Sequence, residues 1–325
     1  MVPAVSGPVV AVLGPTASGK SALGLALAER LGGEIINCDS TAVYRGFDIG
    51  TDKVGFDDRR GIPHHLIDVA DPATPYTAAR FARDAAACIR EIHARGRIPF
   101  LVGGTGFYYR ALTRGLFPGP AADEGLRVRL NRVADRRGVE ALHRWLGRVD
   151  PPSAARVMPR DRMRLVRAIE VYLLTGRALT AHFEATASPI ADCTVAALAL
   201  RIPAPLTEAR VARRVDAQFA RGVVAEVEKL LASGVPADAR PFGGLVYRQI
   251  LEMRAGVRDE SATRALIVQE NRRYARRQLI WFRKEPNLVW IDGAGEAAPT
   301  LASALAMLRA RGIPQEGTLT HGSSD

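Results

Sequence analysis

Eight residues near the start of the chain have the types and the spacing that bind a polyphosphate: Gly14, Pro15, Thr16, Ala17, Ser18, Gly19, Lys20 and Ser21. They fit the pattern G-x-x-x-x-G-K-[ST], in which backbone N–H groups surround phosphate oxygens, the lysine supplies a positive charge and the last hydroxyl binds Mg²⁺. An apolar run over 8–13 precedes them and a helical pattern over 21–30 follows. This strand and helix context favours a phosphate-binding loop, with Ser21 as a Mg²⁺ ligand, over a chance glycine-rich turn.

The elements that must position this loop alternate between strands and helices. The further elements expected in the first part of the chain are strands over 34–38, 62–69 and 97–104 and a helix over 76–95. Such alternation predicts an α/β fold, with a parallel sheet of the P-loop NTPase type and covering helices. Ligands bind at the carboxyl ends of such strands. The phosphate loop, Asp39-Ser40 and Gly103-Gly-Thr-Gly106 each follow a strand, so we expect them to meet in one crevice.

The pattern changes near residue 119, where a helical, arginine-rich stretch replaces the alternation. Strands return over 194–201 and 287–291, with a helix over 214–232 and a basic helix from Asn271 between them. The simplest account is a helical domain inserted into the core. We therefore expect four regions: 1–118, the first part of the P-loop core; 119–191, the inserted helical domain; 192–313, the second part of the core with the basic helix; and 314–325, a disordered tail.

The overall charge favours a polyanionic partner. The net charge is +11 and the isoelectric point is about 10.2, which indicates nucleic acid before membrane; a generally arginine-rich proteome is the alternative. The three cysteines are scattered and form neither a disulfide framework nor a zinc pattern, which suits a reducing cytoplasm. We expect no signal peptide, because the first apolar stretch has no basic region before it and runs directly into the phosphate loop, and no apolar run is long enough to span a bilayer.

Two further groups of residues have more than one interpretation. In the basic helix, one stripe is formed by Arg272, Arg273, Arg276 and Arg277. This stripe either binds a phosphate backbone or is a solvated face. Trp281 and Phe282, which follow it, are expected in the core. In the inserted domain, the arginines around Asp161-Arg-Met-Arg-Leu165 either follow a polyanion or pair with Asp161 and Glu170. The adjacent His64 and His65 are expected to have a structural or hydrogen-bonding role.

Asp39 and Thr105 are the other candidates for chemistry. A carboxylate at Asp39 could coordinate Mg²⁺ through water, act as a general base, or only cap a turn. The Thr105 hydroxyl could contact a substrate, or belong to a plain glycine-rich turn.

Together, these segments resemble the tRNA dimethylallyltransferases, also called tRNA isopentenyltransferases, over roughly residues 8–293. The phosphate loop and Cys38-Asp-Ser40 belong to this resemblance. The other matching segments are Val43-Tyr-Arg-Gly-Phe-Asp-Ile-Gly-Thr51, Pro63-His-His-Leu-Ile-Asp68, Leu101-Val-Gly-Gly-Thr105, Arg164-Leu-Val-Arg-Ala-Ile-Glu170, Tyr274-Ala-Arg-Arg-Gln278 and Trp281-Phe-Arg283. So many ordered matches are far more specific than a phosphate loop alone.

The resemblance implies transfer of a dimethylallyl group from dimethylallyl diphosphate to the N6 amine of the adenosine on the 3′ side of the tRNA anticodon. It implies catalytic roles for Asp39, Lys20 and Thr105, and it adds Arg214 to the phosphate loop as a diphosphate contact. The tRNA anticodon stem-loop would contact Asp39, Ser40, Thr41, Ala42, Thr105, Arg127, Asp161, Arg162, Met163, Arg164, Leu165, Tyr247 and Arg248. The implied protein is a cytoplasmic monomer that uses Mg²⁺ and does not bind a membrane.

The sequence departs from the family pattern at two positions. Val246 stands where the family has Gly, and Asn271 stands where Thr is usual; neither is expected to touch the diphosphate site. Two other functions use the same loop: an ATP-dependent kinase of a small metabolite, and an RNA-binding protein switched by a nucleotide. The kinase leaves the arginine-rich insertion and the basic helix without a purpose.

Overall fold

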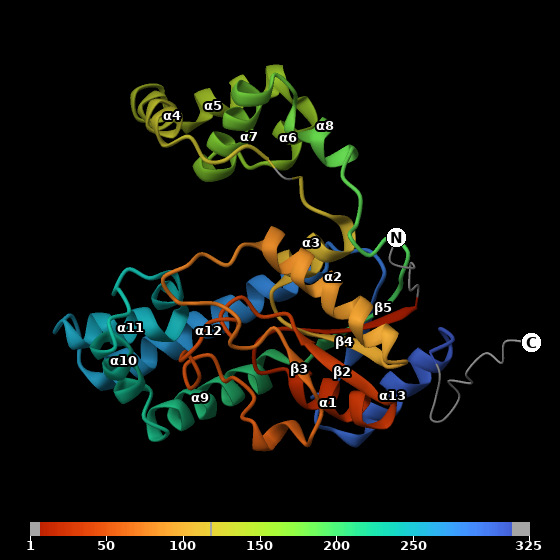
Figure 1. The fold of residues 1–325 in the computed structure, drawn as a ribbon. Coiled ribbons are helices and arrows are strands. Elements are labelled where there is room, and N and C mark those ends of the chain that lie inside the picture. Colours follow the sequence, from red (N-terminus) through yellow and green to blue (C-terminus); the bar gives the residue numbers. More distant parts are fainter. Residues whose placement is uncertain (1–6, 118, 314–325) are drawn as a thin grey trace, which may run out of the picture. The chain divides into compact units, whose positions relative to one another are not determined.

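A computed structural model describes residues 7–117 and 119–313 of the chain (Figure 1). The chain divides into two compact units. The core unit comprises residues up to 113 and from 189 onward, and the helical unit comprises residues 114–188. The sequence placed the insertion at 119–191, and the expected tail over 314–325 lies outside the described residues. None of the helices within the described ranges is long and apolar enough to cross a membrane.

Within the described residues, the core unit is built on one parallel sheet of six strands, as the alternation of elements predicted. The strands are β1 (Pro8–Leu13), β2 (Gly33–Asn37), β3 (His64–His65), β4 (Ile98–Gly103), β5 (Thr194–Arg201) and β6 (Leu288–Asp292). The strand order is β3-β2-β4-β1-β5-β6, so the two strands that follow the helical unit extend the sheet beyond β1. In the register, Val12 of β1 lies opposite Val102 of β4 and Leu198 of β5.

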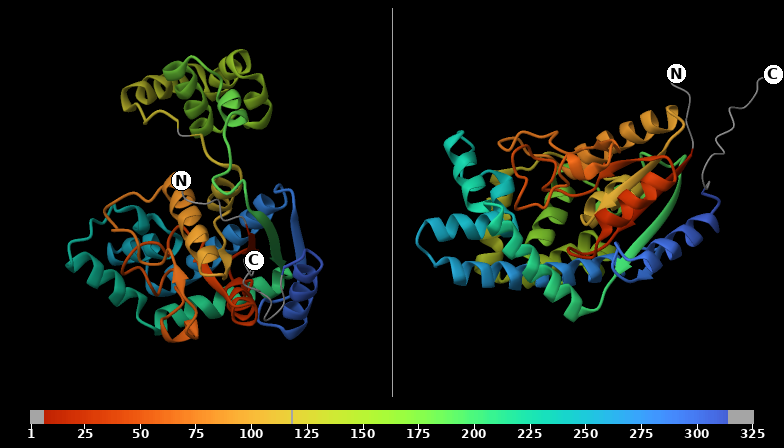
Figure 2. Two further views of the ribbon diagram at one scale, coloured as in Figure 1. Left: turned by 45° about the vertical axis from the view of Figure 1, so that its right-hand side comes forward. Right: turned by 90° about the horizontal axis from the view of Figure 1, so that it is seen from below.

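Helices cover both faces of this sheet, because its central strands are apolar on both sides. Along β1, Val9, Ala11 and Leu13 join one buried cluster, while Val10 and Val12 join another. The second cluster includes side chains of α1 (Lys20–Arg30) and α13 (Ala298–Arg309). The first includes side chains of α2 (Ala78–Ala94), α3 (Gly106–Arg114), α9 (Ala204–Ala220), α10 (Val223–Ala232), α11 (Leu245–Arg254) and α12 (Glu260–Phe282). Figure 2 shows the sheet between these two layers.

Three expected elements differ in the structure. The strand expected over 62–69 is reduced to His64–His65, because Leu66 and Asp68 have φ values of 60° and 58° that end the extended conformation. The helix expected over 214–232 is two helices, since Gly222 takes a φ of 86° between α9 and α10. The basic helix expected from Asn271 begins earlier, at Glu260, where the Asp259 side chain caps it. Short 3₁₀ turns form at Asp57–Arg59 (η1) and Arg240–Gly243 (η2).

The helical unit has its own apolar core. Its helices are α4 (Glu124–Arg137), α5 (Val139–Val149), α6 (Pro151–Arg156), α7 (Arg162–Thr175) and α8 (Leu179–Glu184). Leu130 of α4, Leu142 and Leu146 of α5, and Leu165 and Ile169 of α7 are all buried in one cluster. Apolar side chains at helical spacing therefore hold this unit together, and its described residues contain no strand.

Candidate active site

The phosphate loop joins the end of β1 to the start of α1, as its motif requires. Ala17 and Gly19 take positive φ values of 62° and 85°, which curl the chain. A Cβ on Gly19 would lie 2.2 Å from Oε2 of Glu296 and 2.6 Å from the Gly295 nitrogen, so only glycine fits there. The Gly295 N–H also donates to the Ser18 carbonyl at 2.9 Å. The segment after β6 therefore holds the loop from outside.

Side chains from two distant helices hold the other part of the loop. Arg214 of α9 donates from Nη1 to Thr16 Oγ1 at 2.8 Å, and Arg210 donates from Nε to the Ala17 carbonyl at 2.7 Å. Gln278 of α12 accepts a hydrogen bond from the Thr16 N–H at 2.8 Å. Its amide nitrogen donates to the Gly104 carbonyl, also at 2.8 Å. Gln278 thus links the phosphate loop to the glycine-rich turn after β4.

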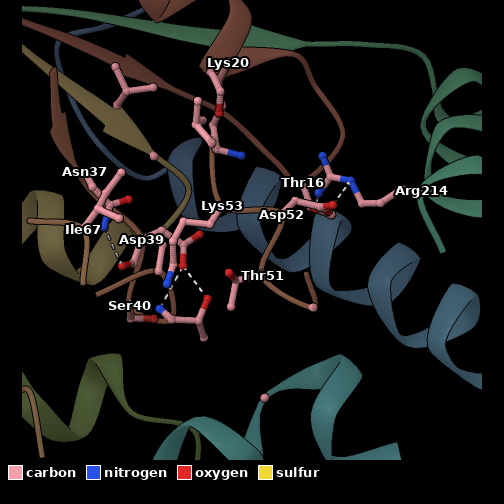
Figure 3. Close-up of a pocket in the computed structure, with 18 of the residues that line it drawn as sticks. Thr16, Lys20, Asn37, Asp39, Ser40, Thr51, Asp52, Lys53, Ile67 and Arg214 are labelled. Carbon is pink, nitrogen blue, oxygen red and sulfur yellow. Dashed lines mark hydrogen bonds and ion pairs between the residues drawn. The ribbon is translucent and has the colours of Figure 1, made fainter. Parts of the chain in front are cut away.

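Lys20 faces a cavity of about 940 Å³ within the core unit. Burial and the nearby Arg214 guanidinium lower the pKa of Lys20 to about 8, although the carboxylates of Asp39 and Asp52 oppose this shift. Figure 3 shows these side chains around the pocket. A partly buried ammonium beside an arginine is electrostatically suited to an anionic ligand, because the ligand's charge would offset the repulsion between the two cations.

Asp39 lies in the same cavity, on the turn that follows β2. Its Oδ1 accepts hydrogen bonds from the Thr41 N–H at 2.9 Å and from the Thr41 hydroxyl at 2.7 Å. Thr105 Oγ1 accepts from the Ser40 N–H at 3.0 Å, so the turn after β4 fixes the turn that carries Asp39. A Cβ on Gly103 would lie only 2.1 Å from the Cys38 carbonyl oxygen, and glycine permits this close approach. The three segments expected at one crevice therefore do meet.

The two positions that depart from the family pattern also line this cavity. Val246 is buried in the first turn of α11, in a helical conformation that needs no glycine. Asn271 donates from its side chain to the Ile267 carbonyl at 2.9 Å. The cavity is also lined by Ser21, Thr41, Ala42, Asp52, Gln218, Arg221, Tyr274 and Arg277.

Several residues expected to contact tRNA have other partners in the core unit. Tyr247 is buried, and its hydroxyl donates to Oε1 of Glu226 at 2.6 Å and accepts from the Gly50 N–H at 3.1 Å. Arg248 is exposed and pairs with Glu270 at 2.7 Å. The buried tyrosine side chain therefore anchors the loop over 48–50, while the arginine remains at the surface.

The other expected tRNA contacts belong to the helical unit. Arg127 donates from Nε and Nη2 to the buried carboxylate of Glu170, at 2.9 and 3.2 Å. Arg162 binds Asn131 and Asp135, and Asp161 caps α7 by accepting from the Arg164 N–H. The Leu165 side chain is fully buried and cannot touch RNA here, whereas Met163 and Arg164 are exposed.

In the basic helix, the four stripe arginines are exposed, Phe282 is fully buried, and Trp281 packs partly buried against the core. Arg272 pairs with Glu208 at 2.6 Å. The predicted hydrogen-bonding role of the two histidines is confirmed: His65 binds Glu34 at 2.7 Å and His64 binds the Ile62 carbonyl at 2.8 Å. All three cysteines are free.

Three residues of the site were not predicted from the sequence: Arg210, Gln278 and Asp52. Asp52 binds Arg214 at 2.8 Å. It directly follows the matching segment 43–51, and this position was the sign that the sequence offered. Gln278 ends the matching segment 274–278 and is buried. A neutral amide that follows several arginines was the one sign in the sequence that this position differs from the basic stripe. Arg210 had no signal beyond its helical spacing of four residues from Arg214.

The side chains at the cavity can be compared with the ligands that Mg²⁺ needs. Among the described residues, no group of three or more His, Cys, Asp or Glu side chains could hold a metal ion. Mg²⁺ commonly binds through substrate phosphates and water with only one or two protein ligands. The Ser21 hydroxyl at the cavity wall fits such a site, in which the substrate supplies most of the ligands.

The fold and the site define a class: an α/β protein with a phosphate-binding loop and a carboxylate facing one cavity, and with an inserted helical unit. The family model described as IPP transferase matches residues 42–285. This match covers most of the chain and begins after the phosphate loop. The chain belongs to the IPP transferase family.

Individual relatives agree with this assignment. The chain is 45% identical over 296 residues to a tRNA dimethylallyltransferase of Geobacter metallireducens, covering 91% of this chain and 96% of the relative. It is 47% identical over 294 residues to the enzyme of the same name in Solibacter usitatus, covering 89% and 94%.

Solved structures also match. A full-length tRNA isopentenylpyrophosphate transferase from Bacillus halodurans has a TM-score of 0.69 at 35% identity, over 94% of this chain and 96% of that one. A eukaryotic dimethylallyltransferase acting on tRNA has a TM-score of 0.78 at 25% identity, over 96% and 82%. The predicted fold class and family are therefore confirmed.

Proposed function

We propose that this protein is a tRNA dimethylallyltransferase that transfers the dimethylallyl group of dimethylallyl diphosphate to the N6 amine of the adenosine next to the anticodon, on its 3′ side, and releases diphosphate. One observation carries the proposal: Lys20 of the phosphate loop and Asp39 at the end of β2 line the same cavity. An anion-binding wall and a proton-accepting carboxylate are what this transfer requires. The relatives named tRNA dimethylallyltransferase support the same activity.

The donor side of the reaction needs stabilisation of a leaving diphosphate. Breaking the allylic carbon–oxygen bond places positive charge on carbon and negative charge on the diphosphate. The backbone N–H groups of the loop, Lys20 and Arg214 would bind that negative charge. Gln278 and Arg210 hold the loop from behind, so its donors need little rearrangement as charge develops.

Mg²⁺ would be held by the Ser21 hydroxyl together with diphosphate oxygens and water. When bound, it neutralises part of the diphosphate charge and so assists its departure.

The acceptor side needs a base, because the adenine amine is a weak nucleophile whose lone pair is delocalised into the ring. Asp39 would accept the N6 proton while the nitrogen attacks the dimethylallyl carbon. Oδ1 of Asp39 is held by two hydrogen bonds from Thr41, which fix the orientation of the carboxylate. Oδ2 has no hydrogen-bond partner among the described residues and is therefore the oxygen assigned to the proton. The Thr105 hydroxyl supports this geometry through Ser40.

The tRNA would present the adenine by unstacking it from the anticodon loop into the cavity, at a cost of a few kcal/mol. The net charge of +11 suits binding of the RNA backbone. Candidates for backbone contacts are the exposed Arg164 of the helical unit and Arg248 of the core unit. We further propose that the protein acts as a monomer in the cytoplasm, where its tRNA substrate is found.

The alternatives make different predictions. A metabolite kinase would transfer phosphate from ATP without a prenyl donor. A nucleotide-switched RNA-binding protein would bind tRNA and form no product. The similarity to named dimethylallyltransferases over about nine-tenths of the chain favours the prenyl transfer over both.

The test is an incubation of the purified protein with Mg²⁺, dimethylallyl diphosphate and unmodified tRNA that has adenosine 3′ of the anticodon. Nucleoside mass spectrometry should show a five-carbon mass gain on adenosine. A parallel reaction with ATP in place of the prenyl donor should show none, and a third with Asp39→Asn protein should show far less product in the same time. ATP consumption without prenylated adenosine would contradict the proposal.

A further inference from the structure

A second carboxylate, that of Asp52, also lines the cavity. Its Oδ2 lies 2.8 Å from Nε of Arg214 and accepts from Nε2 of Gln218 at 3.1 Å, and its Oδ1 lies 3.8 Å from Nη1 of Arg221. The three partners stand at positions i, i+4 and i+7, on one face of α9 and its C-cap. One helix face therefore holds this carboxylate.

The backbone also fixes Asp52 in place. Its φ is 50°, a left-handed conformation that aspartate tolerates better than most residues. Gln218 donates to the Gly50 carbonyl at 3.3 Å as well as to Asp52, so it secures the loop on both sides of Thr51. The Asp52 side chain is 23% exposed, and it is therefore partly shielded from water.

The position of Asp52 matters because it binds the arginine that would hold diphosphate. Arg214 uses Nε for Asp52 and Nη1 for Thr16. A diphosphate on the phosphate loop would bring further negative charges to the same guanidinium. Two anions that bind one guanidinium compete for it, so the carboxylate and the diphosphate contest Arg214.

Resting on the diphosphate site proposed above, we propose that Asp52 is a resident anion of that site, which competes with diphosphate for Arg214. With no diphosphate bound, it neutralises Arg214. When diphosphate binds, Gln218 and Arg221 remain as partners for Asp52. Its charge therefore weakens the retention of diphosphate, the product that must leave before the next donor binds. Asp52 touches no reacting atom and is a positioning residue.

The test measures binding of inorganic diphosphate by calorimetry at about pH 6.5, below the pKa of Lys20, so that Lys20 carries its charge. Asp52→Asn keeps the size of the side chain and an oxygen for Arg214 but removes the charge. It should lower the Kd for diphosphate by about tenfold. The matched control is Asp48→Asn, which removes a charge from the same loop at an exposed residue paired with Lys53. It should leave the Kd unchanged.

A second pair of variants tests whether the effect acts through the arginine. In an Arg214→Gln background, Asp52→Asn should change the Kd less than about twofold, because the contested group is gone. An unchanged or higher Kd for Asp52→Asn alone would mean that Asp52 only orients Arg214, and would overturn the inference. A full tenfold gain in the Arg214→Gln background would also overturn it. Absence of diphosphate binding by the unaltered protein would instead refute the diphosphate site itself.

Discussion

The core unit and the helical unit use their charged side chains in different ways. In the core unit, Lys20 and Asp39 face a cavity and are positioned by neighbours such as Gln278 and Thr41. In the helical unit, Arg127 and Arg167 both bind Glu170, which is fully buried. The first arrangement leaves charges available to a ligand, whereas the second uses arginines to satisfy a carboxylate within the fold.

This difference shows that a high arginine content does not by itself identify an RNA surface. The ion-pairing interpretation of the arginines around Asp161 is confirmed, whereas their contact with a polyanion stays a prediction. Arg162 is bound to Asn131 and Asp135, while Arg164 remains largely exposed beside Asp161. Substitutions in the core unit should therefore change catalysis, and those in the helical unit should change stability or RNA affinity according to burial.

The largest effect on catalysis is expected for Asp39→Ala. Loss of the base should lower turnover by about 10²- to 10⁴-fold, with little change in the affinity for dimethylallyl diphosphate, because the phosphate loop is untouched. Single-turnover kinetics together with donor titration will separate the two quantities. Asp71→Ala, at an exposed loop residue, is the control and should keep full activity. Unchanged turnover in the Asp39 variant would remove the role of this residue as base.

The corresponding change in the helical unit is Glu170→Gln. Burial alone would raise the pKa of Glu170, but hydrogen bonds from Arg127 and Arg167 lower it below its usual value. Its stabilising contribution is therefore present above the unfolded pKa and is lost as the pH falls through the lower folded pKa. At neutral pH, the variant should lose about 3–5 kcal/mol of the stability of this unit, because two arginines lose their buried partner.

Hydrogen exchange of residues 124–184 will measure that loss. The control Glu140→Gln breaks a more exposed pair with Arg160 and should leave the exchange protection nearly unchanged. Diphosphate binding by the core unit should be the same in all three proteins. Equal exchange protection in the Glu170 variant would show that its ion pairs do not stabilise the unit.

A smaller effect is expected for Gln278→Ala in the core unit. It removes the hydrogen bonds to the Thr16 N–H and the Gly104 carbonyl, which join the two turns of the site. The KM for dimethylallyl diphosphate should rise about tenfold, the value of one or two net hydrogen bonds, while kcat falls less. Gln249→Ala is a matched control, since this buried glutamine of α11 binds Glu270 and not the phosphate loop. A fall in kcat alone would contradict a role in holding the loop.

The sequence predicted the parts of the core unit that depend on local patterns. The phosphate loop, the buried strands around it and the Thr77-capped helix α2 follow from motif, hydrophobicity and capping. The strand expected over 62–69 was wrong for most of its length, because the positive φ values at Leu66 and Asp68 leave no trace in the hydrophobic pattern. The break at Gly222 was missed because apolar residues continue at helical spacing on both sides of it.

The contacts that assemble the site could not be predicted in the same way. Gln278 and Thr16 are 262 residues apart, and Arg214 and Asp52 are also joined only by the fold. Helix α11 was not expected, so the burial of Tyr247 and Val246 was not foreseen either. Local sequence indicates which side chains could do chemistry, whereas long-range packing decides which of them are held in place.

A pH dependence should distinguish the charged wall of the cavity from the ion pairs of the helical unit. The pKa of Lys20 is lowered to about 8, chiefly by burial and by Arg214. Bound diphosphate would raise it, so the affinity for the donor is complete below that pH and is lost as the pH rises through it. The Kd for dimethylallyl diphosphate should rise by up to about tenfold per pH unit above pH 8. Lys20→Gln should bind weakly with no such break, and the same break in this variant would assign it to another group.

The smallest effect is expected for Arg164→Ala in the helical unit, and it sharpens the distinction between paired and available arginines. The Arg164 side chain is 69% exposed, and its pair with Asp161 spans 3.2 Å at the surface. Such a pair contributes about 0–1 kcal/mol, so the thermal midpoint of unfolding should barely change.

If Arg164 contacts an RNA phosphate, tRNA affinity should fall a few-fold, and the salt dependence of log K should become shallower by about one unit. Arg309→Ala, on the exposed side of α13, is the control for charge alone. An equal loss of affinity in both variants would mean that only net charge attracts the tRNA, and that exposure of Arg164 does not mark a contact.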